Sequence, residues 1–533
     1  MSIRKKCEKR NGGHRLKLNY KRTILVGFAF FLISAFWQAY DATIPVILTN
    51  KFGMSQTLSG IIMALDNILA VFMLPIFGAI SDKYSGEKHG KRTPFIMIGT
   101  ILAACALVAL SFVDAAQLKN ISDIAAIDDP AALEVIYDRQ KDTQLTTPDG
   151  EKFVLADKFQ KEEFASITSK LTLTSGDEIT NPDYTNYVAP ARQACAADAT
   201  AANKTPLILF IVLLLAVLIS MAVFRSPAVA LMPDVTIKPL RSKGNAIINL
   251  MGTAGGIIVL VLGIVFATGS VENSMMNYTL YYGVIAALML GALAIFRFTV
   301  KEEEWSAEMQ QTTRELGIEE NEPQQAASRK LSKAEMKSLL LILASIALWY
   351  IGYNAITSKY SLYASRVLDM DYNTTLLLAQ AAAIISYLPA GMVASKIGRR
   401  KTILAGVVML TSAFAIASFL RAGSSVLLMN VLFCLAGIGW ATINVNSFPM
   451  VVEMCSGADI GKYTGYYYTA SMAAQIVTPV LSGALMDLTG RMTILFPYAA
   501  IFAGAAFVTM FFVRHGDSKV EAKHGLEALD TED

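Results

Sequence analysis

Long apolar segments separated by shorter polar ones recur along the whole chain. A helix needs about 20 mostly apolar residues to cross a bilayer, and twelve segments reach this length. They lie at 23–48, 56–80, 94–113, 205–230, 245–268, 278–298, 338–360, 374–395, 402–420, 424–450, 463–486 and 493–513. The pattern predicts an all-α membrane protein with twelve transmembrane helices.

The charges of the loops predict the orientation of these helices. Lys and Arg are concentrated in the N-terminal segment 1–22 and in the loops 81–93, 234–244 and 396–401. Because basic loops stay on the cytoplasmic side of a membrane, we expect these loops and both termini, including the tail 514–533, in the cytoplasm.

The polar segment 299–337 separates two groups of six spans. It is rich in Glu, Gln and Lys, and we expect a cytoplasmic linker with a short amphipathic helix near 324–337. The linker divides the chain into an N-terminal half, 23–298, and a C-terminal half, 338–513.

An internal repeat supports this division. Tyr40-Asp41-Ala42 returns as Tyr353-Asn354-Ala355, and Gly78-Ala-Ile-Ser-Asp82-Lys83 returns at the same offset as Gly391-Met-Val-Ala-Ser395-Lys396. Repeated six-helix halves are typical of secondary transporters that rock around a site near the middle of the membrane.

An insertion at 114–204 separates the third and fourth spans and should lie outside the cytoplasm. It is acidic and polar with short apolar patches, so both a small folded cap and a largely irregular loop stay open. Its cysteine, Cys195, has no partner on that side. We expect a membrane-impermeant thiol reagent to reach Cys195 in intact cells and to leave Cys7 and Cys455 unlabelled.

Composition and motifs exclude several classes of protein. Hydrophobic residues make up 54% of the chain and charged residues 17%, which argues against a soluble enzyme or a nucleic-acid-binding protein. No Ser–His–Asp set, phosphate-binding loop or Cys/His metal spacing occurs, so we expect no enzyme, no cofactor and no metal site. A receptor with a sensing domain at 114–204 stays an alternative.

Two acidic residues lie inside predicted spans. Asp66 is near the middle of the second span, where a carboxylate costs roughly 2.5–3.5 kcal/mol on insertion scales. Protonation removes this cost, so Asp66 is the first candidate for proton coupling. The alternative is that Asn67 or a neighbouring helix supplies hydrogen bonds to the carboxylate and that Asp66 has no role in transport. Asp41 lies on one face of the first span with Trp37 and Gln38, which suits recognition of sugar hydroxyls, and it is the second candidate for proton coupling.

Other polar and aromatic residues inside the spans are candidates for substrate binding. They are Trp349, Tyr353 and Asn354 in the seventh span, Trp440 and Asn444 in the tenth, and Arg225 in the fourth. Weaker candidates lie in the eleventh span: Tyr463, Tyr466, Tyr467 and Gln475. Aromatic core packing stays the alternative for the tryptophans. Arg225 could instead extend its charge to the membrane boundary.

The loop after the second span contains a motif of glycines and charged residues, formed by Gly78, Asp82, Lys83, Gly90, Lys91 and Arg92, with a second copy at Gly391, Gly398, Arg399 and Arg400. This motif resembles the signature loop of the major facilitator superfamily. The resemblance implies a gate whose contacts between the halves stabilise the outward-facing state. Ser395 stands where the pattern carries Asp, which implies a weaker second copy.

Five short segments carry a narrower resemblance: Pro75-Ile-Phe-Gly78, Ser81-Asp82-Lys83, Gly90-Lys-Arg-Thr-Pro-Phe-Ile96, Asp66-Asn67 and Gly437-Ile-Gly-Trp-Ala441. They resemble the glycoside–pentoside–hexuronide cation symporters, and within them the sucrose/proton branch, the solute carrier family 45-like proteins. That family imports mono- or disaccharides with H⁺ or Na⁺. Sodium-coupled members carry two carboxylates where this chain has Ala70 and Leu74, so their Na⁺ site is not expected here.

Together these features predict a secondary active transporter in the plasma membrane that works as a monomer and carries a sugar with H⁺ by alternating access. Its partners would be the bilayer, the sugar and the proton, with no nucleic acid. An antiporter or exporter of amphipathic small molecules and a Na⁺-coupled sugar symporter stay alternatives.

Overall fold

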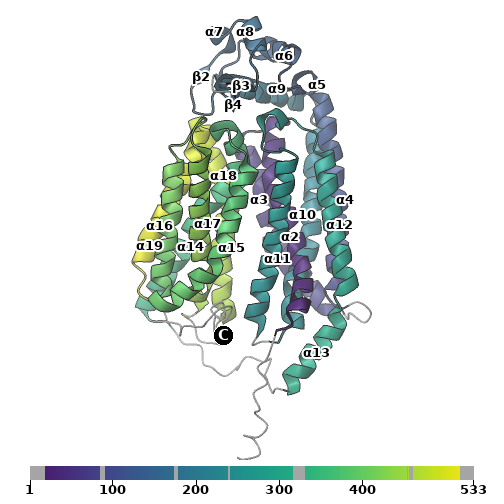
Figure 1. Ribbon diagram of the computed structural model, residues 1–533, viewed down its shortest axis with the longest axis vertical. Helices are drawn as coiled ribbons and strands as arrows, with labels where there is room; N and C mark the ends of the chain where they lie inside the picture. The colour runs from purple at the N-terminus through teal and green to yellow at the C-terminus, as the bar shows by residue number, and fades with distance from the viewer. Residues whose placement is uncertain are drawn as a thin grey trace, which may run out of the picture.

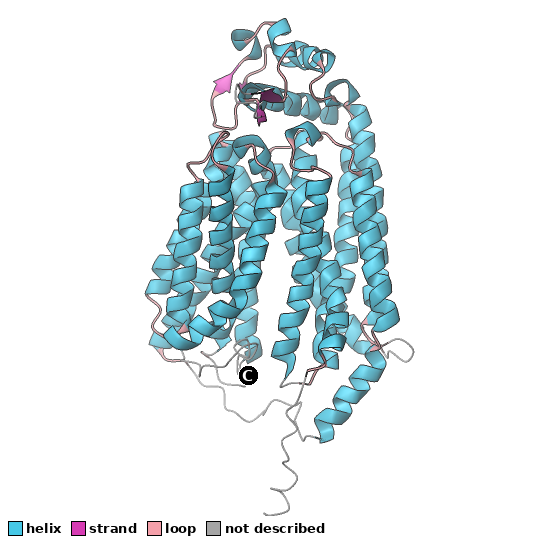
Figure 2. Ribbon diagram, in the orientation of Figure 1, coloured by secondary structure: helices cyan, strands magenta, loops and turns pink. Residues whose placement is uncertain are grey.

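The computed structural model describes residues 18–84, 90–172, 178–237, 240–315, 331–452, 454 and 460–515. In this part of the chain nearly all residues are helical, and the strands are confined to one end of the molecule (Figure 2). Most of the N-terminal segment 1–22 and most of the tail 514–533 lie outside the described residues, as do Cys7 and Cys455.

Twelve long helices form the body of the molecule (Figure 1). The first half contributes α2 (Tyr20–Asn50), α3 (Gln56–Lys83), α4 (Thr93–Asn120), α10 (Thr205–Val235), α11 (Arg241–Val265) and α12 (Thr279–Thr299). The second half contributes α14 (Lys333–Tyr363), α15 (Tyr372–Ile397), α16 (Arg399–Ala417), α17 (Val426–Val452), α18 (Ile460–Thr489) and α19 (Leu495–Phe511). All twelve fall on the predicted spans. Among the described residues, eleven helices are long and apolar enough to cross a membrane, and α15 lies beside them.

These segments are helical because a membrane leaves the backbone no other partner than itself, and polar side chains fix several of the starts. Ser55 accepts a hydrogen bond from the backbone N–H of Leu58 at the start of α3. Ser332 and Glu335 form a reciprocal capping box at the start of α14. Asp371 accepts from the backbone of the first turn of α15.

Each half has its own hydrophobic core. One core is built from α2, α3, α4, α10, α11 and α12, and the other from α14 to α19. Between the halves, α3 lies directly against α18. A Cβ on Gly60 would stand 2.0 Å from the carbonyl oxygen of Pro479, and one on Gly483 would stand 2.2 Å from that of Gln56. Only glycine allows the two backbones to come this close.

The insertion is folded, which decides between the two alternatives left open by its sequence. It contains α5 (Ser122–Ala125), α6 (Pro130–Gln140), β1 (Leu145–Thr146), β2 (Lys152–Phe153), α7 (Leu155–Lys158), α8 (Lys161–Ala165), β3 (Lys170–Thr172), β4 (Glu178–Thr180), a π-helix at Tyr184–Val188 and α9 (Ala189–Ala202). The two strand pairs are antiparallel. We call residues 121–204 the cap, because they cover one end of the bundle (Figure 1).

The cap has a hydrophobic core of its own. Phe153, Phe164 and Val188 are buried in it, and Val271 and Met275 from the connection between α11 and α12 complete it. A short 3-10 helix at Val271–Asn273 supplies the first of these two. The cap is therefore held to the first half by shared apolar packing. We call this end of the molecule the cap end.

The linker contains a helix that the sequence did not predict. α13 (Glu302–Glu315) begins with three glutamates, which suit the positive end of a helix dipole, and it buries Trp305, Met309 and Thr313 on one face. The helix expected near 324–337 is not seen as such: 316–330 lie outside the described residues, and α14 already begins at Lys333. α13 lies at the other end of the bundle, the linker end (Figure 1).

Candidate functional site

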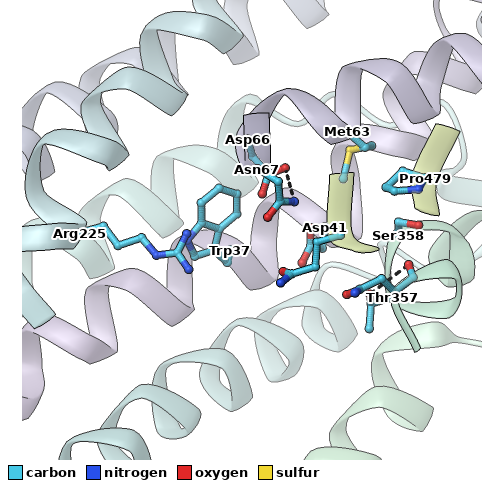
Figure 3. A pocket seen from close by; sticks show the side chains of 11 residues that line it. Trp37, Asp41, Met63, Asp66, Asn67, Arg225, Thr357, Ser358 and Pro479 are labelled. Carbon is cyan, nitrogen blue, oxygen red and sulfur yellow. Dashed lines mark hydrogen bonds between the residues drawn. The ribbon is translucent and has the colours of Figure 1, made fainter. Parts of the chain in front are cut away.

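A polar pocket of about 180 Å³ lies between the two halves. Helices α2, α3 and α10 line it from the first half, and α14 and α18 line it from the second (Figure 3). The lining residues are Trp37, Asp41, Met63, Asp66, Asn67, Arg225, Asn354, Thr357, Ser358, Gln475 and Pro479. Eight of these eleven side chains are polar, so the pocket suits a solute that forms many hydrogen bonds.

Two carboxylates and one guanidinium set the charge of this pocket. The Oδ1 atom of Asp66 accepts a hydrogen bond from Nδ2 of Asn67 at 2.8 Å. Arg225 acts on Asp66 as the opposite charge, and its Cζ atom lies 5.6 Å from the ring centroid of Trp37. The side chain of Arg225 thus faces the pocket instead of extending to the membrane boundary. Because α3 packs against α10, Asp66 and this cation line the same pocket.

Asp41 has a different environment. No described residue donates a hydrogen bond to its carboxylate, and the charge that acts on it is the like charge of Asp66. Two carboxylates in a low-dielectric site repel each other when both are ionised, and a single proton shared by the pair removes this repulsion. The guanidinium of Arg225 offsets part of the charge of Asp66, whereas the charge that acts on Asp41 is negative.

Two donors of the pocket have no acceptor within the described part of the chain. They are Nε1 of Trp37 and Nδ2 of Asn354. Buried polar groups in folded proteins are almost always hydrogen-bonded. Unpaired donors that line a pocket therefore suit a ligand that brings acceptors, such as hydroxyl or carbonyl oxygens.

The structure brings five of the predicted residues together in the pocket: Trp37, Asp41, Asp66, Arg225 and Asn354. Of the four weaker candidates in the eleventh span, Gln475 joins them, and the three tyrosines are absent from the lining. Thr357 and Ser358 were not predicted, although they lie one turn after Asn354 on the same face of α14. That spacing of three and four residues was the signal that could have found them.

The other predicted substrate residues lie elsewhere. Gln38 accepts a hydrogen bond from Nε2 of Gln380 at 2.6 Å, which links α2 to α15. Trp349 does not line the pocket: its side chain is fully buried in the core of the second half. Asn444 contacts Tyr387.

Tyr353 and Trp440 form an aromatic pair. Their rings stack with centroids 3.6 Å apart and planes 4° apart. The ring faces that a sugar could pack against thus cover each other in this conformation, and the lining of the pocket includes neither residue. Trp349 and Trp440 therefore follow the alternative stated for the tryptophans, aromatic packing, in this conformation.

At the linker end, Arg92 is the centre of the signature loop. Its guanidinium forms ion pairs with Asp82 at 2.5 Å and with Asp234 at 2.7 Å. Glu302 accepts hydrogen bonds from the backbone N–H groups of Arg92 and Thr93, both at 2.7 Å. All these groups belong to the first half or to α13, so in this conformation Arg92 ties Asp82 to its own half.

The backbone conformation explains why two positions of the motif are glycine. Gly90 has φ +80°, and a Cβ there would lie 2.4 Å from Cδ of Glu302. Gly398 has φ +94° at the junction of α15 and α16.

The other residues of the two motif copies differ in exposure. Gly78 packs near Ser226, and Gly391 and Arg399 are buried, whereas Lys83 and Lys91 are exposed. Arg400 donates to the carbonyl oxygen of Phe511. The side chain of Ser395 is outside the described part.

At the cap end, polar contacts join the two halves. The carboxylate of Asp487 in α18 accepts from the backbone N–H of Gln56 at 3.0 Å and of Thr57 at 2.7 Å, at the start of α3. Lys359 in α14 is buried and donates to the carbonyl oxygen of Gln56 at 2.7 Å. No pattern in the sequence indicates these contacts, because Asp487 and Lys359 lie near span ends, where solvated charges are common.

The cap also contacts the second half. Pro148 accepts a hydrogen bond from the backbone of Met492 at 2.8 Å. The backbone N–H of Thr180 donates to Asp369 at 2.8 Å. Because the core of the cap is shared with the first half, these contacts make the cap a bridge across the cap end.

Known structures share this fold. The inward-open xylose transporter XylE from E. coli is similar with a TM-score of 0.52 and 13% identity, over 95% of this chain and 98% of that one. A peptide transporter, POT, in complex with sulfate is similar with a TM-score of 0.56 and 11% identity, over 92% and 93% of the two chains. At such low identity the similarity concerns the fold.

Sequence comparison finds two curated relatives, both described as MFS-type transporter ppzB. The protein of Metarhizium rileyi (strain RCEF 4871) is 28% identical over 131 residues, and that of Metarhizium majus (strain ARSEF 297) is 31% identical over 136 residues. The matched region is about a quarter of this chain and about a quarter of each relative.

The family comparison covers more of the chain. Residues 13–125 and 371–529 match the Major Facilitator Superfamily. This match spans the signature loop of the first half and most of the second half, and it agrees with the two six-helix halves and the pocket between them. The chain is therefore a transporter of the Major Facilitator Superfamily.

Proposed function

We propose that this transporter imports a small polyhydroxylated solute, a sugar, together with H⁺ by alternating access. The observation that carries the proposal is the polar pocket between the halves, in which two carboxylates face one guanidinium. The resemblance of Asp66-Asn67 and of the signature loop to the sucrose/proton symporters supports the same class of solute.

The size and lining of the pocket favour a small polar solute. Its volume of about 180 Å³ is below the roughly 300–1,000 Å³ of pockets that hold drug-sized ligands. Amide and hydroxyl groups dominate the lining, and Trp37, Met63 and Pro479 supply the apolar part. This lining fits a monosaccharide better than a disaccharide, and it disfavours the exporter of bulky amphipathic molecules.

The charges of the pocket favour H⁺ as the coupling ion. Among the described residues, Asp41 has neither a hydrogen-bond donor nor a cation that acts on its carboxylate. Protonation of Asp41 therefore costs less free energy than protonation of Asp66. Asp66 keeps its charge beside Arg225 and Asn67 and binds the solute through them. These contacts favour the reverse of the roles expected from the sequence, where Arg225 could not be placed next to Asp66.

Na⁺ coupling finds less support. Sodium-coupled members of the resembling family carry carboxylates at two positions that are Ala70 and Leu74 in this chain. Neither side chain offers an oxygen ligand. Na⁺ binding needs several oxygens around one point, whereas Asp66 already accepts from Asn67.

We place the cap outside the cell and both termini, the linker and α13 in the cytoplasm, with the protein acting as a monomer in the plasma membrane. The basic loops support this orientation. In this conformation the contacts of Asp487 and Lys359 close the outer end, and the Asp82–Arg92 pair stays within one half.

Uptake into proteoliposomes tests the proposal. A panel of radiolabelled monosaccharides, disaccharides and amphipathic cations is offered with an imposed pH gradient, an imposed Na⁺ gradient or neither. We expect a monosaccharide to accumulate only when the interior is alkaline. Accumulation only with an acidic interior would show an antiporter, and accumulation that follows Na⁺ and ignores pH would show a sodium symporter.

A further inference from the structure

A second cavity, of about 40 Å³, lies beneath the cap. Residues of the cap, of the first half and of the second half line it together. They are Asn50, Tyr184, Thr185, Ala189, Arg192, Gln193, Val271, Ser274, Met275, Ser365 and Arg366. It is separate from the central pocket, with which it shares no lining residue.

Arg192 of α9 is the unusual residue of this cavity. Its side chain is 4% exposed, and none of its nitrogens Nε, Nη1 and Nη2 has a hydrogen-bond partner within the described ranges. Its contact is with the ring of Tyr184, 5.6 Å from Cζ. A buried charge without a counter-charge or hydrogen bonds is costly by several kcal/mol, so this guanidinium needs a partner that the protein chain around it does not supply.

A second guanidinium lies in the same cavity. Arg366 comes from the second half and donates to Oε1 of Gln193 at 2.5 Å and to Oδ1 of Asn50 at 2.6 Å. Both acceptors are neutral amides, and no lining residue of the cavity is acidic. The two positive charges are therefore left without a compensating negative charge at the cavity.

We propose that this cavity binds a small inorganic anion of the size of chloride, held by Arg192 and Arg366. An anion there accepts from unpartnered N–H groups of Arg192 and compensates the excess positive charge. The hydroxyl groups of Thr185 and Ser274 add polar atoms to the lining. The cavity has room for a few atoms beyond the single water that needs about 10–15 Å³, which fits a halide better than phosphate or an organic acid.

The position of the site links the anion to the conformation of the transporter. Arg366 belongs to the second half, whereas Arg192 and Asn50 belong to the cap and the first half. The site is complete only while the cap end is closed, so a bound anion stabilises the closed cap end by its differential affinity for the two states. This holds whichever solute crosses the membrane.

Thermal unfolding of the purified full-length protein tests the site. Chloride replaces gluconate at constant ionic strength, and the Tm is followed. We expect a saturable rise of the Tm in the wild type, and a requirement for about tenfold more chloride or greater in Arg192→Gln, because a charge-assisted contact is lost. The matched control is Arg139→Gln, an exposed arginine of the same cap that pairs with Asp123, which should respond like the wild type.

Three results would overturn the proposal: a wild-type Tm that does not depend on chloride, an equal response of Arg192→Gln, or a response to phosphate but not to chloride. If Arg192→Gln does not fold, wild-type crystals grown in bromide decide. An anomalous peak between Arg192 and Arg366 supports the site, and water alone at that position contradicts it.

Discussion

The carboxylate of Asp487 accepts a hydrogen bond from the backbone N–H of Thr57 at 2.7 Å, so a side chain of the second half caps the first turn of α3 in the first half. Gln56 donates to the same carboxylate at 3.0 Å. A carboxylate at the N-terminus of a helix gains from both the free N–H groups and the helix dipole. Since this bond joins the halves, it stabilises one conformation and not the fold of either half.

Asp487→Ala should therefore open the cap end more often. Loss of a helix cap costs about 1–2 kcal/mol, or roughly a five- to thirty-fold change in the populations. The measurement is the rate at which an impermeant thiol reagent, added outside, labels Ser358→Cys in a cysteine-free variant. The rate should rise with Asp487→Ala. Asp129→Ala, which removes the side-chain cap of α6 inside the insertion, is the matched control. An equal rise with this control would contradict the role of Asp487 in closing the cap end.

Asp82→Asn should leave expression and folding nearly unchanged but slow transport. Asp82 is largely exposed, and Arg92 keeps its pairing with Asp234, so the loss of stability is about 0–1 kcal/mol. The gating role predicts slower turnover, because the variant lacks the charge for a contact between the halves in the other state. Ser395→Asp should have a milder effect. If Asp82→Asn transports at the wild-type rate, the loop only determines the orientation of the helices in the membrane and has no gating role.

Cys195 should resist labelling in the folded protein, contrary to what the sequence suggested. Its side chain is buried in the core of the cap, and burial raises the pKa of its thiol to about 11. The thiolate is the reactive form, so near neutral pH the group stays protonated, and reactivity should rise only as the pH approaches that pKa. Mass spectrometry after labelling at pH 7 and after denaturation measures this.

Ser166→Cys, in a Cys195→Ala background, places a thiol on the exposed surface of the same cap. An impermeant reagent should label it in intact cells. Labelling only after permeabilisation would invert the proposed topology, whereas rapid labelling of native Cys195 would contradict its burial.

The spans could be predicted from the sequence because the bilayer imposes one strong rule, about 20 apolar residues per helix. The cap obeys no such rule. Its core joins short apolar patches around Phe153, Phe164 and Val188 with Val271 and Met275, which come from a distant connection between two helices. Nothing local in those patches predicts that they meet. The same is true of Arg192, whose isolation depends on the packing of three parts of the chain.

The candidate site was predicted where charge inside the membrane is costly, as for Asp41 and Asp66. Tryptophans were less informative about the site. Trp37 and Trp349 both lie near amide side chains in the sequence, but Trp37 lines the pocket and Trp349 is part of a hydrophobic core. The guanidinium of Arg225 acts electrostatically on Asp66. Which carboxylate it influences depends on which helices pack together, so the sequence could not divide the roles of the two carboxylates.

The central claim is that Asp41 carries the coupled proton while Asp66, with Arg225, binds the solute. The direct test measures, in proteoliposomes, both accumulation driven by a pH gradient and exchange at equal pH. Asp41→Asn should abolish accumulation and keep exchange. Asp66→Asn leaves Arg225 uncompensated, and it should weaken binding in both assays, by about 1–3 kcal/mol if one charged contact is lost. Accumulation by Asp41→Asn against the gradient, or its loss with intact exchange in Asp66→Asn instead, would contradict this division of roles.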